Sequence, residues 1–224
     1  MENKKTYTLN LECVKPGYAN GVAPGFPFTE KEKWSMVDEA AEAYGKFLDA
    51  LQCDWRNDPN SSDTPRRVAK AYVFDLWKGR YESMSDITSF PSDGYQGIVL
   101  EKDIPLISQC SHHHQTIMGV VHIAYIPGPE GNVVGLSKLN RIVDHFGRRG
   151  AIQEQLTMAI HNAIDKICEG NVGVMVMVKA THNCVSCRGV KHQGASMMTS
   201  EVSGVFADHT KTAKMEVLEM IKMG

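Results

Sequence analysis

The sequence has no long hydrophobic run and no strong excess of charge of either sign. No window reaches the roughly 18 to 20 apolar residues of a transmembrane helix, and the N-terminal MENKKTYTLN lacks the apolar segment of a secretory signal peptide. The 24 Lys and Arg residues nearly balance the 26 Asp and Glu residues, giving a formal net charge of -2. Nothing in this balance indicates a nucleic-acid binder or a polybasic membrane anchor. We therefore expect a cytoplasmic protein with no nucleic acid and no membrane as a partner.

Cysteine is also sparse, with six residues in a chain of 224. This density is too low for the disulfide scaffold of a small secreted protein, and in a reducing compartment the thiols are free for packing or for metal binding. Cys110, Cys184 and Cys187 are the cysteines to consider as metal ligands.

Length and composition, with 42% hydrophobic and 22% charged residues, suit one globular domain with an N-terminal extension. Residues 1–28 are rich in Gly, Pro and Asn and show no steady period, which predicts an extended or partly disordered arm. Residues 29–95 are predicted to form a helical region. Within it, TEKE at 29–32 has the form of a capping box for a helix that ends near Cys53.

A second helix is predicted where Thr64 can cap and Pro65 fits the first helical position, and it ends at Gly79. Short β-branched segments bounded by Gly, Pro or Asn then predict strands, and two longer periodic segments joined around Gly150 predict a pair of helices. The strands are expected at 97–108, 119–127 and 171–182, the helix pair at 136–149 and 151–167, and a final helix at 211–222. Strands that flank a helix pair without regular alternation indicate an α+β fold.

The segment CSHHHQ at 110–115 is a candidate metal site. Cys110 and His113 form a C-x₂-H pair on a turn, a spacing that lets thiolate and imidazole reach one Zn²⁺ ion. Three consecutive histidines cannot all face the core of a strand, because neighbouring side chains alternate sides. The segment THNCVSCRG offers Cys184 and Cys187 as further ligands. If both bind, the shell is closed and structural; if one binds, a place stays open for water and zinc can be catalytic.

A candidate anion site lies in GLSKLNRIV, where Ser137, Lys138 and Arg141 stand close together at the start of a helix. The ordinary alternative is a solvated basic face. Further cations are Arg67, Lys70 and Arg188, of which Arg188 follows Cys184 by four residues.

The segment IQEQLT places Gln153 and Glu154 among helical neighbours. A carboxylate can accept two parallel hydrogen bonds from an N–H/NH₂ edge such as guanine presents, whereas the alternative is an ordinary exposed helix glutamate. The two readings stay open on spacing alone.

Several segments together resemble the GTP cyclohydrolase I family, in the same order and from about residue 30 to 220. They are DTPRRVAK, CSHHHQTIMGVVHIAYIP, GLSKLNRIV, IQEQLT, THNCVSCRGV, and TS with GVF near the C-terminus. The resemblance implies hydrolysis of GTP to 7,8-dihydroneopterin triphosphate and formate, the first step of folate and pterin biosynthesis. It also implies a tunnelling fold over residues 96–224, an antiparallel sheet with a helix pair on one face, preceded by the N-terminal helical region. Family members assemble as homodecamers with active sites at subunit interfaces.

The resemblance also implies roles for the candidate residues. Zn²⁺ would be held by Cys110, His113 and Cys184 with water in the fourth position, and the metal would activate that water. His112 would face the imidazole ring of the substrate, and His182 would act as general acid and base. By the same carry-over, Gln153 and Glu154 would hold the guanine edge, and the triphosphate would be bound by Ser137, Lys138, Arg141, Arg188, Arg67 and Lys70.

Two residues depart from the family pattern. Ser111 stands where the family usually has glutamate, which could weaken zinc affinity or rate. Cys187 is usually not a cysteine; it could enter the zinc shell, and we hypothesise that it packs instead. His114 has no assigned role. Two alternatives remain: a related enzyme that acts on another pterin or deazapurine, and a non-catalytic zinc-stapled assembly protein whose site is closed by Cys187.

Overall fold

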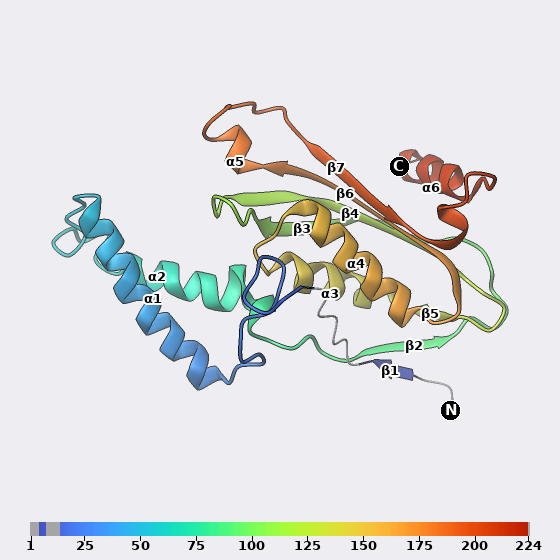
Figure 1. Ribbon diagram of the computed structural model, residues 1–224, viewed down its shortest axis with the longest axis horizontal. Helices are drawn as coiled ribbons and strands as arrows, with labels where there is room; N and C mark the ends of the chain where they lie inside the picture. Colours follow the sequence, from blue (N-terminus) through green and yellow to red (C-terminus); the bar gives the residue numbers. More distant parts are fainter. Residues whose placement is uncertain (1–4, 8–13, 224) are drawn as a thin grey trace.

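The two helices that follow residue 29 form a hairpin that projects from the rest of the molecule (Figure 1). The computed structural model describes residues 5–7 and 14–223. Helix α1 (Glu30–Ala50) begins at the predicted capping box, because the Thr29 hydroxyl accepts from the Glu32 backbone N–H and the Glu32 carboxylate accepts from that of Thr29. It ends before the predicted Cys53.

Helix α2 (Thr64–Ala71) returns antiparallel to α1 and continues through a π-helical turn (Tyr72–Leu76) and a 3₁₀ turn (Lys78–Arg80). The prediction that Thr64 caps this helix is wrong. Asp63 occupies the capping position, but its carboxylate accepts a hydrogen bond from Arg67 instead of from a backbone N–H.

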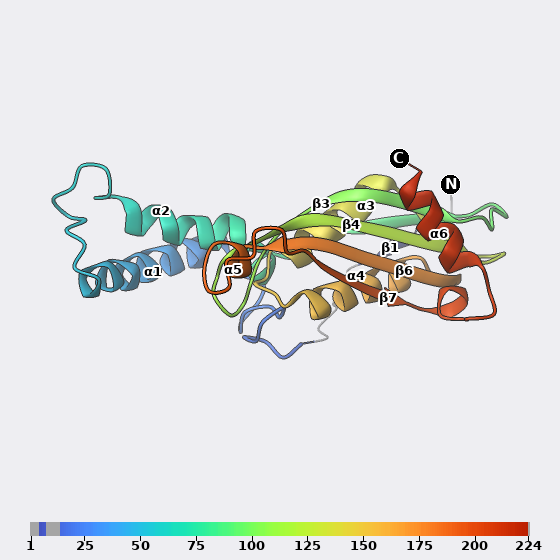
Figure 2. The same cartoon turned by 90° about the horizontal axis from the view of Figure 1, so that it is seen from above.

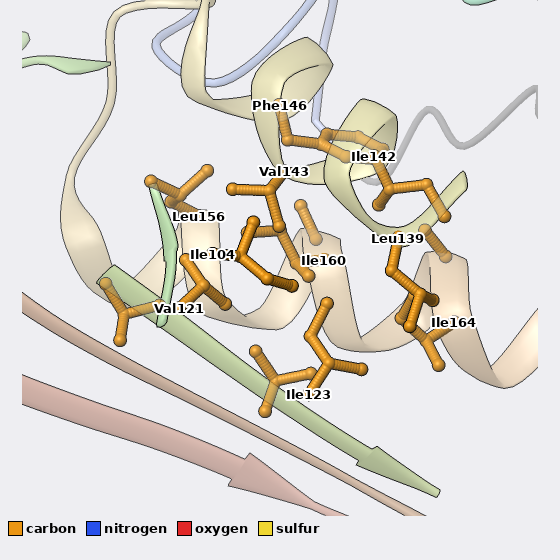
Figure 3. Packing of buried hydrophobic residues seen from close by; sticks show 14 of the residues in the cluster. Ile104, Val121, Ile123, Leu139, Ile142, Val143, Phe146, Leu156, Ile160 and Ile164 are labelled. Atoms are coloured by element: carbon orange, nitrogen blue, oxygen red, sulfur yellow. The ribbon is translucent and has the colours of Figure 1, made fainter. Parts of the chain in front are cut away.

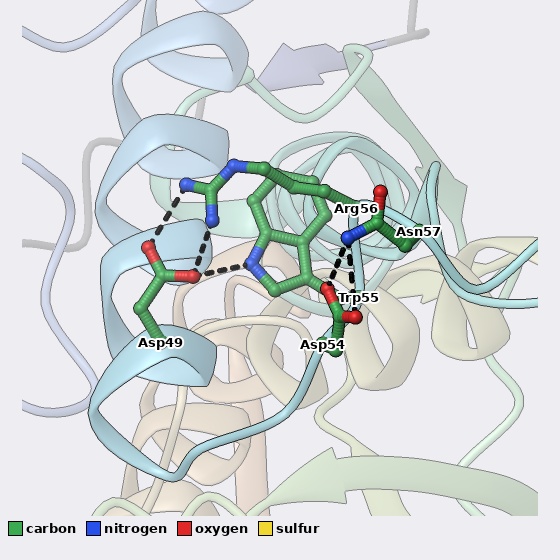
Figure 4. A network of polar contacts seen from close by, with 5 residues as sticks. All are labelled: Asp49, Asp54, Trp55, Arg56 and Asn57. Carbon is green, nitrogen blue, oxygen red and sulfur yellow. Dashed lines mark hydrogen bonds and ion pairs between the residues drawn. The ribbon is translucent and has the colours of Figure 1, made fainter.

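The tip of the hairpin is tied to α1 by polar contacts (Figure 4). The Asp49 carboxylate accepts hydrogen bonds from the Trp55 indole N–H at 2.9 Å and from the Arg56 guanidinium, which also lies over the Trp55 ring. The indole packs where α1 has Gly45, and a Cβ there would lie only 2.9 Å from Trp55 Cζ2. The loop is therefore held against the helix by one aromatic side chain and its partners.

The body of the protein is built on a four-stranded antiparallel sheet in the order β3-β4-β6-β7. Its strands are β3 (Val99–Gln109), β4 (Thr116–Pro127), β6 (Asn171–His182) and β7 (Met197–Val202). Helices α3 (Leu136–Gly147) and α4 (Gln153–Ile167) lie on one face, and α6 (Ala213–Lys222) lies on the other (Figures 1 and 2). This mixture of helices and antiparallel sheet confirms the predicted α+β class.

The main core fills the space between the sheet and the helix pair (Figure 3). Alternate residues of β4 such as Val121 and Ile123 point toward α3 and α4 and meet Ile142 and Ile160, all of them fully buried. On the other face, Ala124 and Met175 pack with Phe206 and with Val217 of α6. Because side chains alternate between the two sides of a strand, both faces of the sheet carry apolar residues, and a helix packs against each face.

A smaller antiparallel sheet has the order β1-β2-β5, from β1 (Lys5–Tyr7), β2 (Ile87–Pro91) and β5 (Asn132–Val134). Its strands, β7 and the short helix α5 (Asn183–Ser186) were not predicted from the sequence. Of the predicted arm, residues 1–4 and 8–13 lie outside the described residues, and residues 14–28 form turns.

None of the helices in the described part of the chain combines the length and the apolar character needed to cross a bilayer.

Candidate metal centre

The turn between β3 and β4 carries the first two candidate ligands. Cys110 follows β3 directly, is buried, and forms an isolated parallel bridge with Ala151, the residue that leads into α4. Within the turn, the Cys110 N–H donates to the Gln115 carbonyl at 2.9 Å and the His114 N–H donates to the Cys110 carbonyl at 2.8 Å. The backbone of the turn is therefore closed on itself, and His112 and His113 are left exposed.

The third candidate ligand, Cys184, lies in the short helix α5, which follows β6, the strand paired with β4. Strand β6 pairs with β4 so that His182 lies opposite Ile117, and α5 begins at the next residue and carries Cys184. The two thiol sulfurs and an imidazole nitrogen of His113 all lie within 4.8 Å of one another. In the described part of the chain this is the only group of three or more His, Cys, Asp or Glu side chains arranged to hold a metal ion.

The donor set fits zinc. Zn–S bonds of about 2.3 Å and Zn–N bonds of about 2.0–2.1 Å put the ligand atoms of a tetrahedral site roughly 3.5–4 Å apart, so only small side-chain adjustments are needed. Burial and the neighbouring Cys110 thiol raise the pKa of Cys184, while Arg188 acts in the opposite direction. A bound cation would reverse this effect by stabilising the thiolates.

Cys187 lies outside this group. Its side chain is exposed, and its sulfur is 3.8 Å from the Ser186 hydroxyl. In the single chain Cys187 is exposed, so the packing part of the hypothesis is wrong there, whereas its place outside the metal group agrees with the expectation that it does not enter the zinc shell.

His182 stands beside the metal group and is partly buried. Burial lowers its pKa, and the nearby Glu154 opposes that shift. The Nε2 atom of His182 lies 2.7 Å from Oε1 of Gln153, whose side chain is only 1% exposed. Glu154, the next residue in the first turn of α4, is exposed. One end of the sheet thus brings together most of the residues predicted from CSHHHQ, IQEQLT and THNCVSC.

The cations of α3 lie at the opposite end of the main sheet. The Asn140 amide donates to Glu101 near the start of β3, and Gly147 is packed against the Ile107 carbonyl near its end, so α3 runs parallel to β3 and begins at the end of the strand away from Cys110. Glu101 precedes Cys110 by nine strand residues (110 - 101 = 9), roughly 25–30 Å at about 3.3 Å per residue. Ser137, Lys138 and Arg141 are therefore remote from the metal group within one chain. Arg141 contacts the Ser85 hydroxyl at 3.4 Å, beside a cavity of about 390 Å³ that it lines with Lys78.

The two cations of α2 lie on the hairpin. Arg67 pairs with Asp63 at 3.1 Å, and the Lys70 ammonium lies 5.7 Å from the centre of the Trp34 ring. Arg188, in contrast, is exposed just after α5 and close enough to influence Cys184. Within a single chain, Arg188 thus lies near the metal group, whereas Ser137, Lys138 and Arg141 of α3 do not.

Sequence reasoning left His114 without a role. Its ring lies against Trp77, with centroids 4.9 Å apart, and near Tyr72, with centroids 6.0 Å apart. Sequence reasoning also missed that the side chain of Gln153 is buried. The signal was present, since residues 153, 156, 157 and 160 share one face of a 3.6-residue period and the last three include Leu and Ile.

Fold and site together define an α+β protein with a two-cysteine, one-histidine metal group and an adjacent histidine. The sequence profile of the family described as GTP cyclohydrolase I matches residues 40–222. GTP cyclohydrolase 1 of Bacillus mycoides (strain KBAB4) is 42% identical over 170 residues, 74% of this chain and 88% of the relative. The protein of the same name from Bacillus anthracis (strain CDC 684 / NRRL 3495) gives the same values. The chain belongs to the GTP cyclohydrolase I family.

Among solved structures, the apo form of the archaeosine synthase QueF-Like shows a weak likeness. It has a TM-score of 0.39 and 20% identity, over 48% of this chain and 93% of that one.

Proposed function

We propose that this chain is a zinc-dependent GTP cyclohydrolase I. It would hydrolyse the C8–N9 and C8–N7 bonds of the guanine ring of GTP, releasing formate and 7,8-dihydroneopterin triphosphate for folate or pterin biosynthesis. It would act in the cytoplasm, where thiols such as Cys110 and Cys184 stay reduced. The observation that carries the proposal is the convergence of Cys110, His113 and Cys184 beside His182 in a member of this family.

The three candidate ligands would hold zinc and leave one coordination place for water or substrate, as in catalytic zinc sites. Zinc, when bound, supplies Lewis-acid chemistry that makes water a stronger nucleophile near neutral pH. The exposure of Cys187 and its position outside the ligand group argue against the closed, purely structural site.

The remaining chemistry would fall to side chains around the group. His182 is positioned to exchange a proton with the substrate during ring opening. The exposed carboxylate of Glu154 would accept the N–H and NH₂ donors of the guanine edge. His112 is exposed, with its ring centroid 6.3 Å from that of His113, and would face the imidazole ring of guanine.

We further propose that the triphosphate is bound across a subunit interface. Ser137, Lys138 and Arg141 are too far from the metal group to share a substrate with it in one chain, and Arg67 and Lys70 lie on the hairpin. In a homo-oligomer such as the decamer of the tunnelling fold, a second copy of the chain would place its own triphosphate-binding residues beside the metal group of the first. Arg188 would act from the same chain as Cys184.

The test is turnover of GTP by the zinc-loaded protein, followed by formate release and by the fluorescence of the oxidised pterin. Cys110→Ser and Lys138→Ala should each be inactive alone. After unfolding and refolding together, mixed oligomers should regain activity, since random mixing gives about one quarter of the sites both intact halves. Mixing Cys110→Ser with Cys184→Ser should restore nothing. Failure of the wild type to release formate would overturn the cyclohydrolase assignment, and failure of the first mixture alone would overturn the shared site.

A further inference from the structure

The side chain of Gln153 is enclosed by the chain itself. Its amide nitrogen lies 3.2 Å from the Val178 carbonyl oxygen, 3.2 Å from the Met197 carbonyl oxygen and 3.1 Å from the Thr199 hydroxyl. These acceptors come from β6 and β7, the strands beneath the start of α4. Gln153 is 1% exposed, so little of its amide is accessible to a substrate.

The directions of these hydrogen bonds follow from the groups involved. A backbone carbonyl can only accept, so the amide atom that faces Val178 and Met197 must be the NH₂ group. The Thr157 hydroxyl donates its proton to the backbone carbonyl oxygen of Gln153 at 2.8 Å. The Thr157 oxygen must therefore accept from the Thr199 hydroxyl at 2.6 Å. Thr199 has then used its proton and accepts from the Gln153 amide. The two protons of the Gln153 NH₂ group are then shared among three acceptors, and no hydrogen-bond direction in the cluster conflicts with another.

The orientation of the Gln153 amide determines the state of His182. With the NH₂ group turned to the strands, Oε1 faces His182 and can only accept, so Nε2 at 2.7 Å must carry a hydrogen. In the neutral imidazole the other nitrogen, Nδ1, then has the free lone pair. No hydrogen bond joins Nδ1 to any residue among those the structure describes.

We propose that Gln153 is a positioning residue that holds His182 in the Nε2–H form and leaves Nδ1 as the nitrogen that exchanges protons with the substrate. This inference rests on the proposed function for the role of His182, and it replaces a guanine contact for Gln153. Guanine recognition then falls to Glu154, which is exposed where Gln153 is buried.

The direct test uses the wild-type oligomer with ¹⁵N-labelled histidine and magic-angle-spinning NMR at a pH where imidazole is neutral. Comparison with His182→Asn identifies the His182 signals. The expected result is a protonated Nε2 and an unprotonated Nδ1. A His182 ring with hydrogen on Nδ1 would overturn the proposal. This readout needs no turnover, so it stands apart from a failure of the cyclohydrolase assignment.

The kinetic test separates positioning from substrate binding. Gln153→Met keeps the length of the side chain but removes the acceptor, and we expect kcat to fall about 10²-fold or more, as for loss of a general acid-base group, with KM changed less than about threefold. Glu154→Gln is the matched control and should mainly raise KM. A Gln153→Met enzyme with raised KM and unchanged kcat would show that Gln153 binds substrate. Thr199→Val, which leaves both carbonyl acceptors of the Gln153 amide, should preserve the Nε2–H signature, and its loss would contradict the proposed hydrogen-bond directions.

Discussion

The ring of His114 packs edge-on against the indole of Trp77, with the centroids 4.9 Å apart and the planes at 77°. His114 belongs to the turn that carries Cys110 and His113, whereas Trp77 directly follows the π-helical end of the hairpin. The backbone N–H of His114 also donates to the Cys110 carbonyl at 2.8 Å. One residue therefore connects the metal-binding turn to the projecting helices.

Replacing His114 should loosen this turn. His114→Gly removes the ring contact, about 0.5–1.5 kcal/mol for an aromatic pair, and keeps the left-handed backbone (φ +51°) at no steric cost. His114→Ala removes the same contact and keeps the left-handed strain of about 1–2 kcal/mol that the wild-type histidine already bears at that φ. We expect zinc affinity, measured by competition with a chromogenic chelator, to be lower for Ala than for the wild type, and higher for Gly than for Ala because Gly relieves that strain. Equal affinity of all three proteins would show that the contact does not support the site.

The zinc site should depend on Cys184 and not on Cys187. Purified wild type and Cys187→Ser should each hold about one zinc per chain by mass spectrometry, and Cys184→Ser should hold much less, because a catalytic site needs all three protein ligands. In the zinc-loaded wild type, a thiol reagent should modify the exposed Cys53 and Cys187 and leave Cys110 and Cys184 protected. Protection of Cys187 by zinc would contradict the three-ligand arrangement.

The segment that precedes α1 should stabilise the entry to α4. Asn20, which is 4% exposed, donates from its backbone to the Gly150 carbonyl at 2.9 Å and from its amide to Gln155 Oε1 at 2.6 Å. Asn20→Ala leaves the Gln155 acceptor without this donor, and we expect a loss of about 1–3 kcal/mol in the free energy of unfolding by urea. The exposed Asn60→Ala is the control and should change stability by less than about 0.5 kcal/mol. Equal effects of the two substitutions would argue that the segment is not anchored at Asn20.

The long periodic elements of the fold could be predicted from the sequence, whereas the short strands could not. Strand β6 has the predicted bounds, and α3 and α4 fall within the predicted segments, because each carries an apolar pattern over 12 or more residues. Strands β2 and β5 have five and three residues and exist through pairing with each other and with β1. Such pairing joins residues that are far apart in the chain, so the local hydrophobic pattern does not predict it.

The same limit applies to the site. The spacing of Cys110 and His113 indicated a shared metal, but the convergence of Cys184 depends on the register that sets His182 opposite Ile117. The separation of Lys138 from Cys110 follows from the parallel packing of α3 on β3, which places the start of the helix at the opposite end of the strand from Cys110 and which no local motif predicts. Residue types therefore predicted the chemistry, and the sheet register determines which of these groups share one chain's site.

His145 should make stability depend on pH in mildly acidic solution. Its Nε2 atom lies 2.6 Å from the Arg149 guanidinium, which can only donate, so the imidazole is an unprotonated acceptor. Burial and the positive charge of Arg149 lower the pKa of His145 to about 3; Lys78 acts in the same direction and Asp144 in the opposite one. Because the pKa is lower in the folded chain than the 6.5 expected when unfolded, protons bind the unfolded state preferentially between these values. The stabilisation is complete above pH 6.5 and is lost as the pH falls.

His145→Gln should remove this dependence, since glutamine can accept from Arg149 and does not titrate. Urea unfolding at several pH values from 7.5 to 5 should show the wild type losing up to about 1.4 kcal/mol per pH unit below about pH 6.5 from this residue alone. The His145→Gln curve should be flatter by that amount, and His192→Gln, which alters an exposed histidine, should follow the wild type. If His145→Gln loses stability as steeply as the wild type, the acid sensitivity arises elsewhere. A flatter curve would establish that the fold keeps the arginine-paired imidazole in the last turn of α3 neutral.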